Sequence, residues 1–454
     1  MKQIITNKLK NDILETMKKN LKKVVPNFIF NIYYAIMALL GALIYGFPSQ
    51  KMIILGVTGT KGKTSTINFI WSCLMAGGHK TGIITTANVR IGDREKLNTY
   101  HMTMPGRFEI QRLMSDMVKA GCTHCIIETT SEGIKQYRHI GIDYDILVFT
   151  NLFPEHLPSH GGSFKKYKET KGSIFAKLNS SKRKIINGNK IEKVIIANKD
   201  SEHSDYFSKF NADKKITFAL ENSTADYKAE YIKDTPSGAS FMIGNNVFDI
   251  SILGKFNVYN ALPAIIIARQ FGIDDSFIKR GLQELKTIPG RMEIINKGQD
   301  FTVIVDYAHE KESMTRVLET AQSIRKVGAK IIVLLGAEGG GRDKAKRPLM
   351  GSIAGRMADY VIVANVDPYD DDPQEILNDI AVATEQAGKV RDQNLFIIED
   401  RRVAINKSFH LAKADDIVII TGKGAEQSMI IGKQTIPWDD RNVVREELST
   451  LRRK

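Results

Sequence analysis

A glycine-rich stretch with two lysines is the part of this chain best suited to chemistry: Gly56-Val-Thr-Gly-Thr-Lys-Gly-Lys63-Thr64-Ser65. It follows an apolar run at 52–55 and precedes a helix-like pattern at 67–71. Glycines let a backbone wrap closely around phosphates, and the N–H groups that open a helix point at the anion. Lys63 is then placed to reach terminal phosphates and Thr64 to hold Mg²⁺. Val57 stands where the strict spacing has glycine, so this variant loop predicts binding of a nucleoside triphosphate.

Further polar side chains follow other strand-like runs. Glu128 ends the apolar run 125–127, where a carboxylate near a phosphate loop is well placed to bind Mg²⁺. A glutamate and two histidines follow the run 145–149, in Glu155-His156-Leu-Pro-Ser-His160. Histidines in surface loops are more often solvated than functional, but these three side chains belong to the same sheet edge as the phosphate loop. The lysine-rich stretch 166–175 has the composition of a solvated helix face.

Strand-like and helix-like segments alternate through most of the chain, which predicts an α/β fold. The alternation runs from 52 to about 150 and resumes after a Pro-Gly turn at 289–290, with a polar, lysine-rich region near 179–250 between. Ligands of open α/β sheets bind at the carboxyl ends of the strands, so the second alternating region is predicted to be functional too. We expect three parts: a basic arm with an apolar segment (1–50), a central P-loop ATPase domain with a parallel sheet (51–289), and a Rossmann-like α/β domain (290–454).

The amino-acid composition excludes several classes of protein. The 454 residues are 43% hydrophobic, enough for about two or three folded domains. Three cysteines cannot form a disulfide framework and fit a reducing cytoplasm, and the lone Cys122-Thr-His-Cys125 pattern favours buried thiols over zinc or redox chemistry. The net charge of +14 comes without a nucleic-acid-binding motif, so we expect no nucleic-acid partner. A basic surface also suits anionic lipid, nucleotides and phosphorylated substrates.

An uncharged run of twenty residues, 28–47, follows a lysine-rich start of the chain. Its length is enough to span a bilayer, but a simple span conflicts with a basic arm and a nucleotide site that both favour the cytoplasm. Three interpretations stay open: an interfacial or re-entrant segment, a span with the short N-terminus outside, and a buried core or dimer helix. Tyr33, Tyr34 and Tyr45 fit a membrane interface. We expect a cytoplasmic protein that contacts the inner face of the membrane through 28–47.

Nine motifs in this order resemble those of the Mur ligases, over about residues 52–445, and most closely the branch that adds the third amino acid of the peptidoglycan peptide. They are Thr58-Gly-Thr-Lys-Gly-Lys-Thr64, Glu128-Thr-Thr-Ser131, Asn151-Leu-x-x-Glu-His156, the Lys171 segment, Gly254-Lys-Phe-Asn257-x-x-Asn260, Gly290-Arg-Met-Glu293, Asp306-Tyr-Ala-His309, Gly341-Arg-Asp-Lys-x-Lys-Arg347-Pro and Gly422-Lys-Gly-x-Glu426.

The resemblance implies an ATP- and Mg²⁺-dependent amide ligase that adds an amino acid to a muramoyl-dipeptide-type substrate through an acyl phosphate. Lys63 and the loop amides would stabilise the transferring phosphoryl group. Thr64 and Glu128 would hold one Mg²⁺ and His156 a second. Lys171 matches the family's carbamylated lysine, which helps place the second metal.

The resemblance also assigns binding residues. The nucleotide would contact Gly59, Thr60, Lys61, Gly62, Lys63, Thr64, Ser65, Asn260, Arg291, Asp306 and His309. The two substrates would contact Thr103, Pro105, Ser131 and Arg138 on the muropeptide side, and Arg342, Asp367, Tyr369, Gly422 and Glu426 on the amino-acid side.

Three departures from the family pattern matter. The metal motif Asp-His-Leu-Asp is Glu155-His156-Leu-Pro here, and the histidine is kept. The diaminopimelate selector Asp-Asn-Pro-Arg is replaced by Val366-Asp-Pro-Tyr369, followed by the acidic run 370–372. Tyrosine cannot grip a distal carboxylate as arginine does, so we expect L-lysine or a similar diamine, although the acidic run also fits a solvated turn.

The third departure is that only about fifty residues precede the loop, where the family has a UDP-binding domain. The muropeptide is therefore recognised otherwise or differs, for example by being held at the membrane. Two other functions remain as alternatives: a folylpolyglutamate-type or other ligase of the superfamily, and a Mur-like nucleotide-binding scaffold or amidotransferase partner.

Overall fold

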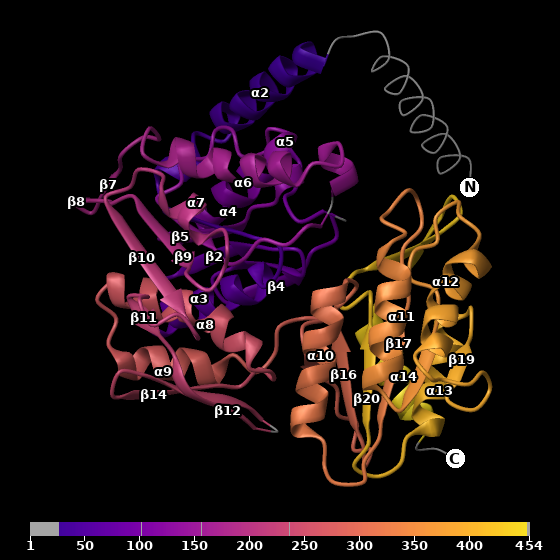
Figure 1. Ribbon diagram of the computed structural model, residues 1–454. Helices are drawn as coiled ribbons and strands as arrows, with labels where there is room; N and C mark the ends of the chain where they lie inside the picture. Colours follow the sequence, from indigo (N-terminus) through magenta and orange to yellow (C-terminus); the bar gives the residue numbers. More distant parts are fainter. Residues whose placement is uncertain (1–26, 101, 156, 236, 452–454) are drawn as a thin grey trace.

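The computed structural model describes residues 27–100, 102–155, 157–235 and 237–451, and two large sheets organise this part of the chain (Figure 1). His156, for which we predict metal binding, lies outside the described residues.

The first sheet has nine strands and surrounds the phosphate loop. Seven strands pair in parallel, and β3 and β4 add an antiparallel edge. Apolar runs make its central strands, which are buried on both faces. In sheet order the strands are β11 (Tyr227–Lys228), β10 (Lys214–Ala219), β9 (Val194–Asn198), β6 (Ile146–Phe149), β1 (Ile53–Thr58), β5 (His124–Glu128), β2 (Thr81–Ile84), β3 (Asn88–Ile91) and β4 (Arg94–Leu97).

Helices cover both faces of this sheet, and each face has its own apolar core. On one face lie α3 (Lys63–Ala76), α8 (Phe256–Gln270) and α9 (Asp275–Glu284), beside the small sheet of β12 (Glu230–Thr235), β13 (Gly238–Ile243) and β14 (Asn246–Ile250). On the other lie α4 (Arg107–Lys119), α5 (Ser131–Lys135), α6 (Phe164–Leu178) and α7 (Ser204–Ser208). Shorter elements complete this part: η1 (Pro48–Gln50), η2 (Leu157–His160), β7 (Ile185–Ile186) and β8 (Asn189–Lys190).

The second sheet has six strands, all parallel except the edge strand β15. Their order is β15 (Glu293–Ile294), β16 (Thr302–Asp306), β20 (Ile417–Thr421), β17 (Ile331–Leu335), β18 (Tyr360–Val363) and β19 (Leu395–Ile397). One face packs on α10 (Lys311–Ile324), α11 (Lys346–Met357) and α12 (Pro373–Gln386), the other on α13 (Arg401–Leu411) and α14 (Asp440–Leu451), with a hairpin of β21 (Ser428–Ile431) and β22 (Gln434–Pro437). The predicted α/β class with two parallel-sheet parts is confirmed. The domain boundaries stay predictions.

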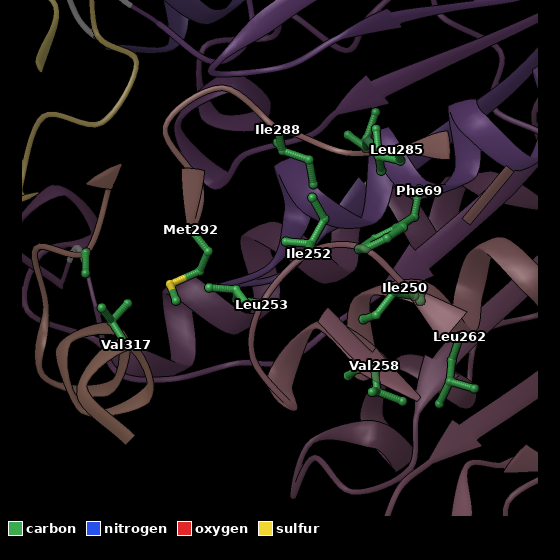
Figure 2. Close-up of a cluster of buried hydrophobic side chains, with 14 of the residues drawn as sticks. Phe69, Ile250, Ile252, Leu253, Val258, Leu262, Leu285, Ile288, Met292 and Val317 are labelled. Atoms are coloured by element: carbon green, nitrogen blue, oxygen red, sulfur yellow. The ribbon is translucent and has the colours of Figure 1, made fainter. Parts of the chain in front are cut away.

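Apolar side chains continue across the junction of the two sheets (Figure 2). Phe69 of α3 and Ile250 of β14 belong to the same buried cluster as Met292, beside β15, and Val317 of α10. Thr60, just after β1, and Asp306, the last residue of β16, line one cavity, so the carboxyl ends of these strands face a common space. This arrangement lets residues far apart in the sequence form one site.

Helix α2 (Asn27–Ile44) holds most of the apolar run and packs along α4. Its contact side consists of small residues, with Ala38, Gly41 and Ala42 buried, whereas most of its large apolar side chains are exposed. It is therefore not a core helix of this chain. Among the residues that the structure describes, no helix is long and apolar enough to cross a membrane.

Candidate active site

The phosphate loop joins β1 to α3 through four residues, 59–62. Gly59 and Gly62 have φ of 151° and 83°, in the region that favours glycine. A Cβ on Gly59 would lie 2.0 Å from Thr150 Oγ1, and one on Gly62 would lie 2.2 Å from Asn260 Oδ1. Val57 is a buried β1 residue paired with Glu128, which explains why no glycine is needed there. The N–H groups of the first turn of α3 have no partner within the helix and form an anion site.

Two lysines, half-buried Lys63 and buried Lys171, meet at this loop without a carboxylate partner. Lys63 Nζ donates to the carbonyls of Gly59 (3.2 Å) and Thr60 (2.9 Å). Lys171 Nζ, from α6, donates to the same Gly59 carbonyl (2.9 Å), and Lys171 is only 2% exposed. Burial lowers the pKa of Lys63 and lowers that of Lys171 well below its ordinary value, and the Lys63 charge lowers the latter further. The loop thus holds more positive charge than the described residues around it neutralise.

Glu128 lies at the end of β5, beside Thr64, and is 3% exposed. Its carboxylate accepts hydrogen bonds from Thr64 Oγ1 (2.8 Å) and from the N–H (2.9 Å) and hydroxyl (3.0 Å) of Thr86. Within the described residues no lysine, arginine or histidine nitrogen lies within 4.0 Å of it. A buried carboxylate and a hydroxyl side by side are oxygen ligands that Mg²⁺ prefers, so the pair fits a bound ion. The described part of the chain holds no cluster of three His, Cys, Asp or Glu side chains suited to a metal.

Glu155, which replaces the family's aspartate, is a further buried carboxylate at the loop. One oxygen pairs with Lys61 Nζ at 2.9 Å, and the other, Oε1, is buried without a hydrogen-bond partner. We gave Glu155 no role from the sequence beyond its place in the motif. Glu155 lines the same cavity as Lys63 and Glu128.

A cavity of about 250 Å³ lies between the loop and the second sheet. Its lining from the central part includes Thr60, Lys61, Gly62, Lys63, Thr64, Ser65, Thr103, Glu128 and Asn260, and from the second part Arg291, Asp306 and His309. These twelve predicted residues are thus brought together, although they come from several separate segments of the chain.

Backbone and ring contacts hold the second-sheet side of this cavity. Asp306 accepts from the N–H groups of Met292 and Ala308, each at 2.8 Å. Burial raises the pKa of Asp306, and burial lowers that of His309 well below 6.5, so the imidazole is neutral. The Arg291 guanidinium lies 4.3 Å from the centre of the Tyr307 ring. Arg291 is therefore held at the junction, where it can meet an anion.

A second cavity of about 560 Å³ shares Asn260 and Arg316 with the first. Its lining includes the aromatic rings of Phe153, Phe164 and Tyr259, as well as polar groups. Flat apolar rings beside amide groups suit a planar base. We did not single out these aromatic residues from the sequence, where the only signal was the position of Phe153 two residues after Asn151.

The amino-acid-side residues form a buried network behind Tyr307. Lys423 pairs with Asp367 (2.7 Å) and with Glu426, which also accepts from the Tyr307 hydroxyl at 2.9 Å. Burial opposes the charge on Lys423, but Glu426 and Asp367 outweigh it and raise its pKa. Gly422 precedes this lysine with φ of 110°. Asp367, Gly422 and Glu426 are thus close together, one residue away from the first cavity.

Arg342 lies beside Tyr369 next to this network: burial opposes the charge on Arg342, but Tyr369 and Glu338 outweigh it and raise the pKa of the guanidinium. Tyr369 has a φ of 54°, and a Cβ on Gly340 would lie 2.7 Å from its ring. The acidic run that follows is largely structural: Asp371 lies 3.6 Å from buried Arg347, and Asp372 caps α12 through the Gln374 N–H. Only Asp370 is left exposed without such a contact among the described residues.

Of the residues predicted for the muropeptide side, Thr103, Pro105 and Ser131 lie at the amino ends of α4 and α5, and Arg138 follows the carboxyl end of α5. Thr103 Oγ1 is 2.8 Å from Thr86 Oγ1, and Ser131 Oγ is 3.1 Å from His160 Nε2. Arg138 donates to the Met104 carbonyl, next to Pro105. Of the four predicted residues only Thr103 lines the first cavity.

A second buried lysine network escaped sequence reasoning. Lys346 Nζ lies 3.2 Å from Glu310 Oε1 and also contacts Glu338. Burial disfavours the Lys346 charge, but both carboxylates outweigh this and raise its pKa. Burial raises the pKa of Glu310 to about 7. Lys346 stands in a motif that we singled out, but the sequence does not show that Glu310 and Glu338 converge on it.

Two family models match most of the chain. The Mur ligase middle domain matches residues 57–268, and the Mur ligase, glutamate ligase domain matches 290–424. A UDP-N-acetylmuramoyl-L-alanyl-D-glutamate--2,6-diaminopimelate ligase of Bacillus cereus is 36% identical over 431 residues, covering 94% of this chain and 84% of the relative. A UDP-N-acetylmuramyl-tripeptide synthetase of Roseiflexus is 36% identical over 427 residues, covering 91% and 82%.

Solved structures agree. A UDP-N-acetylmuramoyl-L-alanyl-D-glutamate--2,6-diaminopimelate ligase superposes with a TM-score of 0.60 at 30% identity, covering 88% of this chain and 79% of that one. A folylpolyglutamate synthase of Mycobacterium tuberculosis has a TM-score of 0.67 at 16% identity, covering 92% and 95%, and shares the fold alone. The resemblance of the motifs is thus confirmed by both the whole sequence and the fold. This chain belongs to the Mur ligase family, whose members are ATP-dependent ligases that form amide bonds and use Mg²⁺.

Proposed function

We propose that this enzyme joins an amino acid, L-lysine or a similar diamine, to the carboxylate of a muramoyl-dipeptide-type acceptor, in the synthesis of peptidoglycan precursors. One observation carries the proposal. The cavity of about 250 Å³ has the unpaired cation Lys63 on one side and Arg291 on the other, with the Thr64–Glu128 pair between the loop and the acceptor-side Thr103. This arrangement suits transfer of a phosphoryl group to an acceptor.

The reaction has two balanced steps. A carboxylate oxygen of the acceptor attacks the γ-phosphorus of ATP, ADP leaves, and an acyl phosphate forms. The neutral amine of the amino acid then attacks the acyl carbon, phosphate leaves with the bridging oxygen, and the amine loses a proton. Lys63 and the first N–H groups of α3 would stabilise charge on the transferring group.

Mg²⁺ would be held by Thr64 and Glu128, and would neutralise charge on the phosphates. His156 and Lys171 would serve a second ion. Glu155 adds a nearby carboxylate oxygen without a partner. On the nucleotide, Gly59 to Ser65 would contact phosphates, and Asn260, Arg291, Asp306 and His309 would contact adenine, ribose or phosphate.

Carbamylation of Lys171 is part of the proposal. Its lowered pKa favours a neutral amine, whose nitrogen can attack the carbon of CO₂ and release a proton to give a carbamate anion. That anion would attract Lys63 and a metal ion, both of which a protonated Lys171 would repel. Carbon-13 NMR tests this step directly. In buffer with ¹³C-bicarbonate, the wild-type protein should show a carbamate resonance that Lys171→Ala lacks.

The preference for a diamine rests on Tyr369 at the selector position. The supporting charge is smaller than the sequence suggests, because Asp371 and Asp372 have structural contacts and Asp370 alone is exposed. Several relatives are named as diaminopimelate ligases, so diaminopimelate is the competing amino acid to compare with L-lysine. The test measures kcat/KM for L-lysine and meso-diaminopimelate; a preference for diaminopimelate would contradict this part.

A cytoplasmic location belongs to the same proposal, because ATP and the activated precursors are found there. Acceptor-side contacts would come from Thr103, Pro105, Ser131 and Arg138, and amino-acid contacts from Arg342, Asp367, Tyr369, Gly422 and Glu426. A screen of acceptors against amino acids, read out as ATP-dependent phosphate release with Mg²⁺, tests the function. Release that requires both a muropeptide and a diamine supports it, release with a folate and glutamate supports a folylpolyglutamate-type ligase, and nucleotide binding without release supports a scaffold.

A further inference from the structure

Helix α2 places small side chains against the protein and large apolar side chains towards the outside, which is the opposite of most surface helices. The stripe that touches α4 consists of small residues, with Ala38, Gly41 and Ala42 buried. The large apolar side chains point outward, each between 41% and 66% exposed: Phe28, Ile29, Ile32, Tyr33, Ile36, Leu39, Leu40, Leu43 and Ile44. A helix that served only to stabilise this fold would bury its large side chains.

The small residues allow α2 to pack closely against α4 and the loop at Gly141. A Cβ on Gly41 would lie 3.3 Å from the Arg107 carbonyl and 3.5 Å from Phe108 Cα, at the start of α4. Ala42 Cβ is 2.8 Å from the position of a Cβ on Gly141, which has φ of +75°. The outward face is therefore held in a fixed orientation, with α2 at the edge of the molecule (Figure 1).

The helix is also tied to the acceptor side of the site. The Arg107 guanidinium lies 4.0 Å from the centre of the Tyr34 ring and donates to the Gln136 carbonyl. The Gln136 side chain in turn accepts from Arg138 at 2.6 Å, and Arg138 donates to the Met104 carbonyl. A surface that binds α2 would thus lie beside the loop that precedes α4.

Charge identifies the partner. The 26 residues before α2 carry seven lysines and two acidic residues, and α2 itself carries no charged side chain. Clustered lysines next to an exposed apolar helix are attracted to anionic lipid headgroups while the apolar face enters the interface. Two copies meeting through this face would instead bring two lysine-rich segments towards each other. Tyr33, which is 53% exposed on the outward face, has an amphipathic ring of the kind that lies at the headgroup level.

We propose that the outward face of α2 docks this enzyme on an anionic lipid surface, with the helix lying along the interface and its small-residue side on α4. This inference does not depend on the ligase chemistry. It concerns a surface that the proposed reaction does not use.

The experiment is flotation of the full chain with vesicles of phosphatidylcholine containing phosphatidylglycerol, and with vesicles of phosphatidylcholine alone. The variant combines Ile32→Gln, Ile36→Gln, Leu39→Gln and Leu43→Gln, which are exposed positions on one stripe. The matched control is Val327→Gln with Val403→Gln, two exposed apolar side chains far from α2. We expect the wild type and the control to float with anionic vesicles, less so in high salt, and the α2 variant to bind at least about tenfold more weakly.

Equal recovery of the wild type and the α2 variant in the soluble fraction would overturn the proposal. So would a wild-type dimer, measured by light scattering without lipid, that the α2 variant converts to a monomer without any loss of vesicle binding. Circular dichroism of the variant checks its fold. Phosphate release with a water-soluble acceptor should be the same in wild type and variant, so a failed docking test and a failed ligase assay are distinguishable.

Discussion

Two pairs of lysines in this enzyme have opposite surroundings. At the phosphate loop, Lys63 and Lys171 donate to backbone carbonyls, and burial lowers the pKa of both. In the second part of the chain, Lys346 and Lys423 are also buried, but each contacts two carboxylates, which outweigh burial and raise the pKa. Lys63 is half-buried and the other three lysines are buried, so the main difference between the pairs is whether carboxylates lie beside the ammonium groups.

The presence or absence of carboxylate partners distinguishes lysines that bind a ligand from lysines that stabilise the fold. A buried cation without an anion is costly unless a ligand supplies the missing charge. In the proposed function, a bound polyphosphate would supply the missing charge beside Lys63, and carbamylation would turn Lys171 itself into an anion. Lys346 and Lys423 need no ligand, because the chain itself provides their carboxylates. The first pair is therefore predicted to matter for the reaction and the second pair for the fold.

The largest expected effect is that of Lys63→Met. Losing a preorganised charge at the transferring phosphoryl group should lower kcat for phosphate release by about a thousandfold or more. Lys165→Met, at an exposed position of α6, is the matched control and should retain wild-type turnover. A loss of less than about tenfold in Lys63→Met would show that this lysine is not the phosphate-binding cation.

The next effect concerns Lys171. Assays in CO₂-depleted buffer should lose activity by about 10- to 100-fold, with recovery on addition of bicarbonate. The pH dependence has a defined sign: as pH falls through the lowered pKa of Lys171, the amine gains a proton, the neutral form disappears, and the bicarbonate requirement rises. Lys171→Ala should be weakly active and insensitive to bicarbonate. Activity of the wild type that never responds to bicarbonate removal would rule out the carbamate.

For the free energy of unfolding we expect the reverse: a substitution in the Lys346 network should have a larger effect than one at Lys63. Lys346→Met leaves Glu310 and Glu338 buried without their cation, and should lower the free energy of unfolding by about 3–5 kcal/mol. Lys63→Met removes a half-buried charge that has no carboxylate partner, and should leave the free energy of unfolding unchanged or higher. Urea denaturation without nucleotide measures both. Equal destabilisation by the two variants would remove the distinction between the pairs.

The smallest effect is a pH dependence at Glu310. Its pKa of about 7 lies above the ordinary 4.5, so the folded protein holds this proton more tightly than the unfolded chain does. Its contribution to the free energy of unfolding is therefore complete below pH 4.5 and is lost as pH rises to about 7. Glu310→Gln should reduce the slope of unfolding free energy against pH in that window. An unchanged slope would contradict the assignment.

Sequence reasoning reached the features that depend on local order along the chain. The glycine loop, Glu128 at a strand end and the two parallel-sheet parts all follow from apolar runs and the residues that end them. The aromatic lining of the second cavity and the Lys346 network could not be predicted, because their members come from separate strands and helices. Helix α2 is a third case: it is apolar on all sides, so periodicity does not distinguish its faces, and only the difference in side-chain size shows which one contacts protein.

The central claim is that the unpaired cations at the loop handle a phosphoryl group passing to an acceptor carboxylate. The most direct measurement uses a muropeptide acceptor with ¹⁸O in its reacting carboxylate, together with ATP, Mg²⁺ and L-lysine, followed by mass spectrometry of the released phosphate. An acyl phosphate requires one labelled oxygen in each phosphate released with product. Product formation with unlabelled phosphate, or with the label in AMP, would contradict the account.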